Sequence, residues 1–361
     1  MNMKKCISNS LLLVLILSGI LYSACTGLPD VEFTKSYVSF VIADEDLAKT
    51  STDEYGDYDL NSIVEDGFIA SLYYNAADGT QSRYLAESQR VPHFDNIGKK
   101  DYLFHFSPVV YWPSAGTVDT YAIFPTNLSI DSDTKSVSFS NFDCAVDFFA
   151  GRTMKVSPSD AVVSETDPTK KMIPLKFERP LSWLYGFEVK LIVDNSAKVY
   201  YGTKADQIKL RVNAIRISGP DSGTFTFFTG DEPFAGSWSN VSGSQTYNVL
   251  STPTALLPQD EYSDVLKNRY YFIPQGDYKL VVNYSIMFDG LALYTANGTL
   301  DMKGKQNEES SAGEKVFASG KRTTIQVEAH MGFEPYLVFV VQSDPDDPFA
   351  NMEWQELDAD D

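Results

Sequence analysis

The chain has 361 residues, of which 43% are hydrophobic and 13% aromatic, and it carries a formal net charge of −20. This length and apolar content allow two domains with buried cores. The acidic balance argues against nucleic acid as a partner, because phosphate contacts require a basic surface. Of the three cysteines, Cys6 and Cys25 lie near the N-terminus, so we predict no internal disulfide and a small buried hydrophobe at Cys144.

The N-terminus predicts a secretory signal peptide over residues 1–24. Lys4 and Lys5 precede an apolar run at residues 11–21, and a basic start before a short hydrophobic stretch is typical of such signals. The run is shorter than the roughly 20 residues that a membrane-spanning helix needs. We therefore expect a removable segment and not a membrane anchor.

The end of this segment resembles a bacterial lipobox. The small residues Ser23 and Ala24 directly precede Cys25, which predicts cleavage between Ala24 and Cys25 and a lipid, such as one carrying palmitate, on the Cys25 thiol. The alternative is an ordinary signal peptide cut near Ala24 with an incidental cysteine, and Tyr22 favours it, because an aliphatic residue is more usual there. On the lipobox interpretation, the exported chain begins at Cys25 and has a net charge of −22, because Lys4 and Lys5 leave with the signal.

The exported chain is predicted to begin with a strand at residues 35–42, followed by an acidic segment. Residues 44–59 contain seven carboxylates and one basic residue, Lys49. Calcium takes oxygen ligands of this kind, but the segment lacks the D-x-[DN]-x-[DN]-G spacing of a calcium loop. A solvated acidic loop is the expected structure.

The rest of the N-terminal half alternates short apolar runs with polar turns, including a tight turn at Asp78-Gly79. Strands are predicted at 63–74, 102–106, 109–112, 120–124 and 136–139. Residues 156–171 combine prolines, serines, threonines and mixed charge, which predicts an inter-domain connection. We therefore expect an N-terminal domain at 25–160 and a C-terminal domain at 161–361.

The C-terminal half shows the same pattern. Strands are predicted at 187–193, 210–217, 224–228, 278–286, 323–327 and 336–341. We expect 323–327 to pair with 278–286, and the apolar 336–341 to be covered on both faces. The best helical period, at 260–268, is weak. Many short strands with hardly a helix predict an all-β chain with two β-sandwich domains.

Catalytic and metal-binding motifs are scarce. The histidines His93, His105 and His330 lack the close His or Cys spacing of a zinc site, and we expect them on strand surfaces. The chain has neither a G-x-S-x-G elbow nor a phosphate-binding G-x-x-x-x-G-K-[ST] loop. A hydrolase with two carboxylates about 5 to 10 Å apart across a cleft is a third hypothesis. The sequence predicts a protein that is not an enzyme and has no cofactor.

Aromatic side chains suggest a second function, the binding of glycans by a surface lipoprotein of a nutrient-uptake system. The candidate stacking platforms are Trp112, Trp183, Trp238 and Trp354. Trp238 lies in the Gly/Ser-rich stretch 236–243, predicted to be a loop, and is the best candidate for an exposed ring. The alternative is that these rings fill the cores of the sandwiches.

Several stretches, taken together, resemble the fimbrillin family of type V pilus subunits. They are residues 63–79, Asp147-Phe148-Phe149-Ala150-Gly151, Pro174-Leu175-Lys176-Phe177, Phe272-Ile273-Pro274-Gln275, and the last apolar strand with the late Trp354. They extend over nearly the whole exported chain. Arg179-Pro180 departs from the family, which commonly has a histidine just after the Phe177 strand.

The resemblance implies two transthyretin-like Greek-key β-sandwich domains and export to the outer membrane as a lipoprotein. A protease would remove the first strand, usually after Arg or Lys, and a strand of the next subunit would fill the open groove. The chain would then be a structural or adhesive subunit of a surface pilus, or fimbria. Its partners would be other pilus subunits, the membrane through the lipid, and host or bacterial surface ligands.

The removable strand expected from this resemblance is the first one. Its residues are Lys35, Tyr37, Val38, Phe40 and Ile42. Lys49, in the acidic segment, is the expected cleavage site, because a protease needs a mobile segment; Arg83 and Arg90 are later options. An anchor or tip subunit would need no such site.

Overall fold

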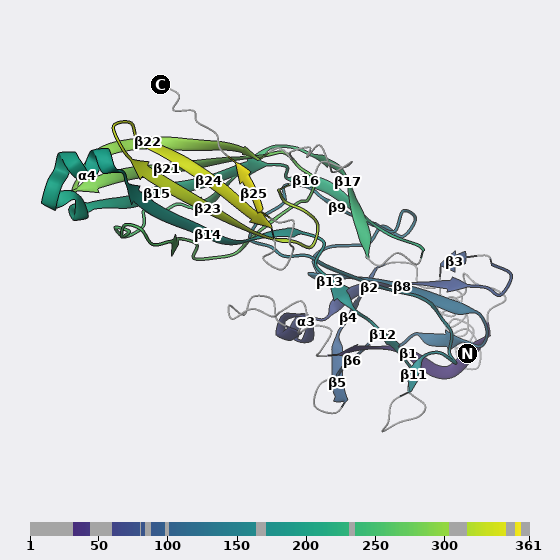
Figure 1. Ribbon diagram of the computed structural model, residues 1–361. Coiled ribbons are helices and arrows are strands. Elements are labelled where there is room, and N and C mark those ends of the chain that lie inside the picture. Colours follow the sequence, from purple (N-terminus) through teal and green to yellow (C-terminus); the bar gives the residue numbers. More distant parts are fainter. Residues whose placement is uncertain are drawn as a thin grey trace, which may run out of the picture.

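The structure is a computed structural model that describes residues 32–43, 60–79, 81–83, 88–97, 101–163, 171–230, 235–302, 316–343 and 351–354. The chain is all-β, as predicted, with its sheets in a two-domain arrangement. The N-terminal and C-terminal parts lie end to end (Figure 1). The predicted signal peptide, Ala24, Cys25 and Lys49 lie outside the described residues. No helix in the described ranges is long and apolar enough to cross a membrane.

The N-terminal part consists of two sheets that enclose a hydrophobic core. The first sheet has the order β11 (Val162–Val163), β12 (Lys171–Pro174), β1 (Phe33–Ala43), β6 (Asp101–His105) and β5 (His93–Ile97), with β7 (Tyr111–Pro113) also paired to β1. The second has the order β13 (Phe177–Glu178), β10 (Phe149–Val156), β8 (Thr117–Phe124), β2 (Phe68–Asn75) and β3 (Gln81–Arg83), with β4 (Gln89–Val91) paired to β2.

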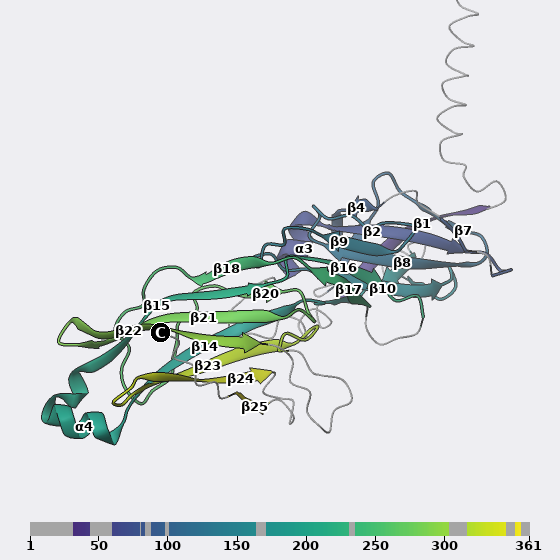
Figure 2. The ribbon, with the colours of Figure 1, turned by 90° about the horizontal axis from the view of Figure 1, so that it is seen from above.

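The C-terminal part contains three sheets. One has the order β19 (Ser263–Asp264), β14 (Ser182–Val193), β23 (Arg322–Met331), β24 (Tyr336–Ser343) and β25 (Asn351–Trp354), with β20 (Tyr270–Phe272) paired to β14. Another has the order β18 (Gln245–Leu250), β15 (Ile208–Gly219), β21 (Tyr278–Phe288) and β22 (Leu291–Met302), whose strands run side by side in Figure 2. The third joins β17 (Gly236–Ser242), β16 (Ser222–Phe227) and β9 (Ser136–Phe139). The described helices are α3 (Leu60–Asp66), α4 (Asn195–Tyr201) and the 3₁₀ helix η1 (Gly202–Gln207).

Period-two alternation correctly predicted the long strands. In β14, Phe187, Val189 and Leu191 are buried, whereas Glu188 and Lys190 between them are partly exposed. Branched and aromatic side chains at every second position give such a strand one apolar face. Cys144 is buried, as predicted, and burial raises the pKa of its thiol to about 12.

The predicted strand at 63–74 was wrong at its start. Residues 63–66 belong to α3 and not to the strand, which begins only at Phe68. The helix ends at Gly67, whose φ of +70° favours glycine and whose Cβ, if present, would lie 2.4 Å from the carbonyl oxygen of Val91. The segment with the weak helical period, 260–268, forms no helix: it contains only β19, and Asp260 has a φ of +61°.

Pairing in the C-terminal part also differs from expectation. β23, which contains the predicted strand 323–327, pairs with β14 in parallel and with β24 antiparallel, and not with β21. In β24, buried Leu337 and Phe339 alternate with half-buried Val338, so the strand is not fully covered on both faces. Short-range patterns identify strands but not their partners, which are chosen by packing across the whole domain.

The segment that connects the two parts contributes strands to the N-terminal sheets before the chain enters the C-terminal part. Downstream of residue 160, β11 and β12 join the sheet of β1, and β13 pairs with β10. In the other direction, β9 pairs with β16. One hydrophobic cluster therefore unites residues of both parts, among them Ile69, Tyr121, Phe148, Phe225 and Trp238.

A buried ion pair lies at this junction. Asp147 is fully buried and accepts hydrogen bonds from Nε of Arg179, at 2.7 Å, and from the backbone N–H of Phe148, at 2.8 Å. The Arg179 guanidinium also lies 3.9 Å from the ring centre of Trp183, a cation–π contact. Burial raises the pKa of Asp147 to about 6, and Arg179 opposes this rise. Arg179, which departs from the pattern of the resembled family, therefore forms the ion pair with Asp147, the first residue of one of the motifs that carry the resemblance.

This raised pKa predicts a pH dependence of folding. Between the ordinary value of 3.8 and about 6, the folded chain binds more protons at Asp147 than the unfolded chain, so the free energy of unfolding falls as the pH rises through this window. Across this pH window, the free energy of unfolding of the wild type should fall by on the order of 2–3 kcal/mol relative to that of Asp147→Asn. Urea unfolding at several pH values measures this difference.

Arg179→Met is the matched variant. Without the Arg179 charge, the pKa of Asp147 should rise further, so the fall in the free energy of unfolding should extend to higher pH. A wild-type stability that rises relative to Asp147→Asn over this window would show that the carboxylate is stabilised as the anion.

Candidate functional site

The first described strand, β1, lies in the interior of its sheet. Val38 to Val41 pair in parallel with Lys171 to Pro174 of β12, and Ser39 to Ala43 pair antiparallel with β6. The N-terminal end of β1 pairs with β7, and the Val38 N–H donates to the carbonyl oxygen of Val110 at 2.6 Å. Because β1 has neighbours on both sides, its removal would leave two open strand edges facing one groove.

The side chains of β1 are also central to the N-terminal core. Val38, Phe40 and Ile42 are all 0% exposed. The Phe40 ring makes edge-on contacts with Phe68 and Phe106, at centroid distances of 5.6 and 5.5 Å. Burying such a side chain contributes roughly 1.5–3 kcal/mol. The predicted strand thus exists, and its alternate apolar residues fill the N-terminal core.

One residue of β1 fits its surroundings less well. Ser39 is 0% exposed, and its hydroxyl has no hydrogen-bond partner among the described residues. A buried, unpaired hydroxyl costs about 1–3 kcal/mol. A strand that carried an apolar residue at this position would bind between β12 and β6 more tightly than β1 does.

The remaining predicted positions on the N-terminal part fall in paired strands. Lys35 is exposed and Tyr37 half-buried on β1, where Tyr37 pairs with Tyr111. Arg83 lies on β3 and Arg90 on β4, and both are paired with β2. A protease must pull its substrate into an extended, unpaired form, so the ladders disfavour cleavage at either arginine.

The tryptophans do not form the glycan platform predicted from sequence. Trp112, Trp183 and Trp238 are buried, and the stretch 236–243 is mostly strand β17 and not a loop. Trp238 packs on Phe139 and Phe225 and donates its indole N–H to the Pro180 carbonyl oxygen at 2.9 Å. The expectation of an exposed Trp238 was wrong because a Gly/Ser-rich composition also suits an edge strand whose small residues cover a large ring.

A polar groove of about 570 Å³ lies near the end of β15 and the turn between β17 and β18. Its lining includes Ser218, Gly243, Gln275, Asp277 and Asp301. The aromatic residue in the lining, Tyr278, is buried and donates its hydroxyl to the Ile273 carbonyl oxygen. The groove therefore presents hydroxyls, amides and carboxylates but no exposed ring on which a sugar could stack.

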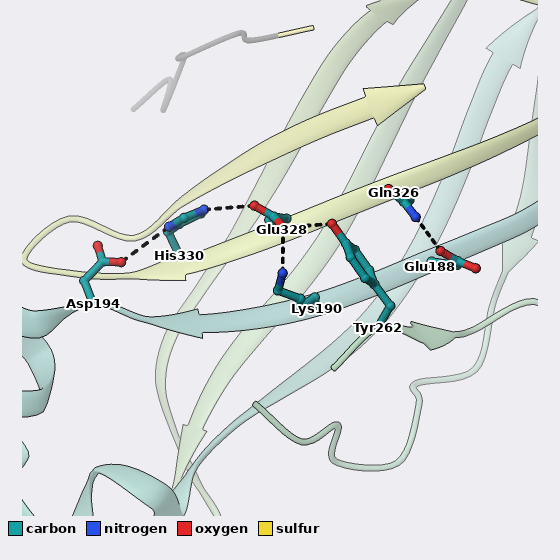
Figure 3. A network of polar contacts seen from close by, with 7 residues as sticks. All are labelled: Glu188, Lys190, Asp194, Tyr262, Gln326, Glu328 and His330. Atoms are coloured by element: carbon teal, nitrogen blue, oxygen red, sulfur yellow. Dashed lines mark hydrogen bonds and ion pairs between the residues drawn. The ribbon is translucent and has the colours of Figure 1, made fainter. Parts of the chain in front are cut away.

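A polar network lies on the sheet of β14 and β23 (Figure 3). Glu328 accepts hydrogen bonds from Nζ of Lys190, at 2.9 Å, and from the Tyr262 hydroxyl, at 2.8 Å. His330 lies 3.4 Å from Asp194 and 3.5 Å from Glu328, and its ring stacks on Tyr336. The sequence predicted His330 on a strand surface but gave no sign of these partners, which come from distant segments of the chain.

The electrostatics of this network favour strand cohesion and not acid catalysis. Burial tends to raise the pKa of Glu328, but the hydrogen bonds from Lys190 and Tyr262 and the charges of Lys190 and His330 outweigh it, so the pKa is lowered. A general acid at neutral pH would need a raised pKa. In the described part of the chain, no group of three or more His, Cys, Asp or Glu side chains could hold a metal ion.

Comparisons with known proteins give similarities in structure. No family model matches the chain, and no curated protein matches it significantly. A fimbrial protein from Bacteroides vulgatus aligns with 14% identity and a TM-score of 0.49, covering 79% of this chain and 95% of that one.

Two further solved structures are similar over comparable lengths. A fimbrilin from Porphyromonas gingivalis aligns with 11% identity and a TM-score of 0.39, covering 86% of this chain and 97% of that one. A fimbrial assembly protein from Parabacteroides distasonis aligns with 8% identity and a TM-score of 0.36, covering 87% and 96%. One of these structures is thus a fimbrilin, and the fimbrillin family is the one that the sequence motifs resemble.

The Glu328 network predicts a second pH effect, opposite in sign to that of Asp147. The folded-state pKa of Glu328 is lowered. Its contribution to the stability of the fold is therefore present at pH values above its ordinary pKa of 4.5 and is lost as the pH falls through the folded-state pKa. Glu328→Gln should cost about 0.5–1 kcal/mol at neutral pH, and the difference from wild type should shrink in acid.

Thermal unfolding followed by circular dichroism at several pH values measures this difference. Glu334→Gln, at an exposed position on the turn between β23 and β24, is the control. A cost that is the same at every pH would mean that the charge of Glu328 has no part in the network's stability.

Proposed function

We propose that the chain is a structural or adhesive subunit of a bacterial surface pilus, assembled by exchange of β1 for a strand of another subunit. The observation that carries the proposal is the place of β1: it is the first strand of the described chain, lies between β12 and β6, and fills the core with Val38, Phe40 and Ile42. Main-chain hydrogen bonds on both sides and alternate side-chain pockets are the features that β-strand addition uses.

Proteolysis would prepare the groove. A cut after Lys49, in the acidic segment that follows β1, would leave β1 attached only by hydrogen bonds and apolar contacts. An incoming strand could then replace it residue by residue, forming new pairs with β12 and β6 as the old ones break. A better fit at the position of Ser39, whose hydroxyl is unpaired, would favour the incoming strand.

The order of segments links assembly to the membrane. Cys25, the proposed lipid attachment site, precedes β1, so a cut after Lys49 would release lipid and strand together. The lipid would then hold the subunit at the outer membrane only until it enters the fimbria. A subunit that escapes the cut would keep its lipid and serve as an anchor. In this scheme the partners are other pilus subunits and the outer membrane.

Limited proteolysis tests the first step. A trypsin-like protease should release an N-terminal peptide that ends at Lys49 and leave a stable core, as seen by mass spectrometry. Lys49→Ala should prevent this release, and Arg90→Ala, on a paired strand, is the matched control that should not. Degradation of the whole chain, or assembly with residues 26–49 still present in the polymer, would contradict the proposal.

Exchange rates test the groove itself. In the cut protein, a fluorescent label can follow dissociation of the β1 peptide. Dissociation should slow by about tenfold in Ser39→Ala, because the peptide no longer buries an unpaired hydroxyl, which costs about 1–3 kcal/mol. Phe40→Ala should speed dissociation by more than tenfold, because large-to-small changes in a core cost about 3–5 kcal/mol. Equal rates in the two variants would show that β1 does not leave through this groove.

A further inference from the structure

The longest free strand edge in the described chain belongs to β22. β22 spans Leu291–Met302 and, among the described strands, pairs only with β21. Figure 1 shows it along the upper border of the C-terminal part. From Tyr294 to Met302 the register with β21 is unbroken. A long, regular edge presents a row of N–H and C=O groups that can pair with another strand.

The composition of this edge is unusual for so acidic a chain. Residues 291–300, LALYTANGTL, contain no charged side chain, although the net charge of the chain is −20. Leu291 and Leu293 are 73% and 42% exposed. Proteins commonly protect exposed edges with charged residues, prolines or bulges, and this stretch of β22 has neither charge nor proline. Two copies of the chain would repel each other over much of their surface, but not here.

Other free edges in the described chain are shorter or distorted. β17, also uncharged, has seven residues, a φ of +52° at Asn240 and a register shift against β16. β18 has six residues and a register shift against β15. Bulges of this kind twist an edge away from further pairing. β22 also has a register shift against β21, at Leu293, but its ladder from Tyr294 to Met302 is unbroken and longer than either of these edges.

A ladder of uncharged polar side chains runs across the sheet and ends at this edge. Asn213 on β15 donates to Asn283 and Ser285 on β21, each at 2.8 Å. Asn283 in turn donates to Asn297 at 2.8 Å, and Ser285 lies 2.9 Å from Thr295. Side-chain ladders of this type keep strands flat and in register. They reach β22 with amide and hydroxyl groups that a next strand could continue.

The opposite face of β22 is built for close packing. Leu300 and Met302 are buried, and Tyr294 and Ala296 pack against the core. Gly298 has no room for a side chain, because a Cβ there would lie 2.2 Å from Cδ1 of Leu337. β22 thus has one apolar face and one polar face that is uncharged up to Thr299, and a partner strand with the same alternation would extend both.

We propose that β22 pairs antiparallel with β22 of a second copy of this chain, with Ala296 on the twofold axis. In this register Thr295 lies opposite the second copy's Asn297, and Tyr294 opposite its Gly298, all within the unbroken part of the ladder. Apolar-face residues then oppose apolar-face residues, as cross-strand pairs must. Asp301 lies away from the axis and not opposite another acid. The contact requires no cut and no removal of β1, so it is independent of the strand exchange proposed above.

Charged pairs placed across the axis test both the contact and its register. Thr295→Lys with Asn297→Lys puts two lysines opposite two lysines of the second copy, whereas Thr295→Lys with Asn297→Glu puts opposite charges there; both positions are exposed and lie in the unbroken part of the ladder. Sedimentation velocity of the uncut, purified chain from about 1 to 100 μM should show a dimer for the wild type. The dissociation constant should rise by roughly tenfold or more in the first variant and return to near the wild-type value in the second, because like charges directly opposite each other destabilise strand pairs and opposite charges stabilise them.

Circular dichroism should show that both variants keep the wild-type fold, since both positions lie at the edge of the sheet. A wild type that is monomeric over the whole range would overturn the proposal. So would equal dissociation constants for the two double variants, because the self-association would then not depend on strands paired in this register.

Discussion

The structure depends on one constraint: a strand in the interior of a sheet must have its backbone groups paired on both sides. β1 meets this constraint through β12 on one side and β6 on the other, and its apolar side chains complete the core between the two N-terminal sheets. The rest of that sheet would have two unpaired edges without it, and buried backbone groups without partners are costly. The fold therefore needs an occupant at this position, but the hydrogen-bonding pattern alone does not require that the occupant belong to the same chain.

The division of the hydrophobic core limits the damage that loss of β1 would cause. The cluster that contains Val38, Phe40 and Ile42 is separate from the larger cluster that joins the two parts of the chain. β9, paired with β16, and the Asp147–Arg179 pair belong to the junction and have no contact with β1 in the ladder. A groove could thus open at β1 while the junction and the C-terminal sheets keep their packing, as the proposed strand exchange requires.

Much of the strand content could be predicted from the sequence, because strand formation is encoded locally. Alternation identified β1, β14, β15 and β21, and the turn at Asp78-Gly79 follows β2 as expected. Partners and exposure could not be predicted in the same way. Trp238 lies among small residues in sequence, but it is buried because Phe139, Phe148 and Phe225 surround it in space. The contacts of Glu328 with Lys190 and Tyr262 cross between strands that are far apart in the chain, so no local pattern could indicate them.

β1 and β22 represent two different uses of the same backbone chemistry. β1 is enclosed, so a competitor can bind only as β1 leaves, and the exchange must break about as many hydrogen bonds as it forms. β22 has one free side, so a partner can pair without displacing any described strand. The sequences of the two strands differ accordingly: β1 places its apolar residues at alternate positions that fill a core, whereas residues 291–300 of β22 carry none of the charges that would keep copies of an acidic chain apart. Contacts through β1 are therefore expected to form slowly and to persist, and contacts through β22 to be reversible and to depend on concentration.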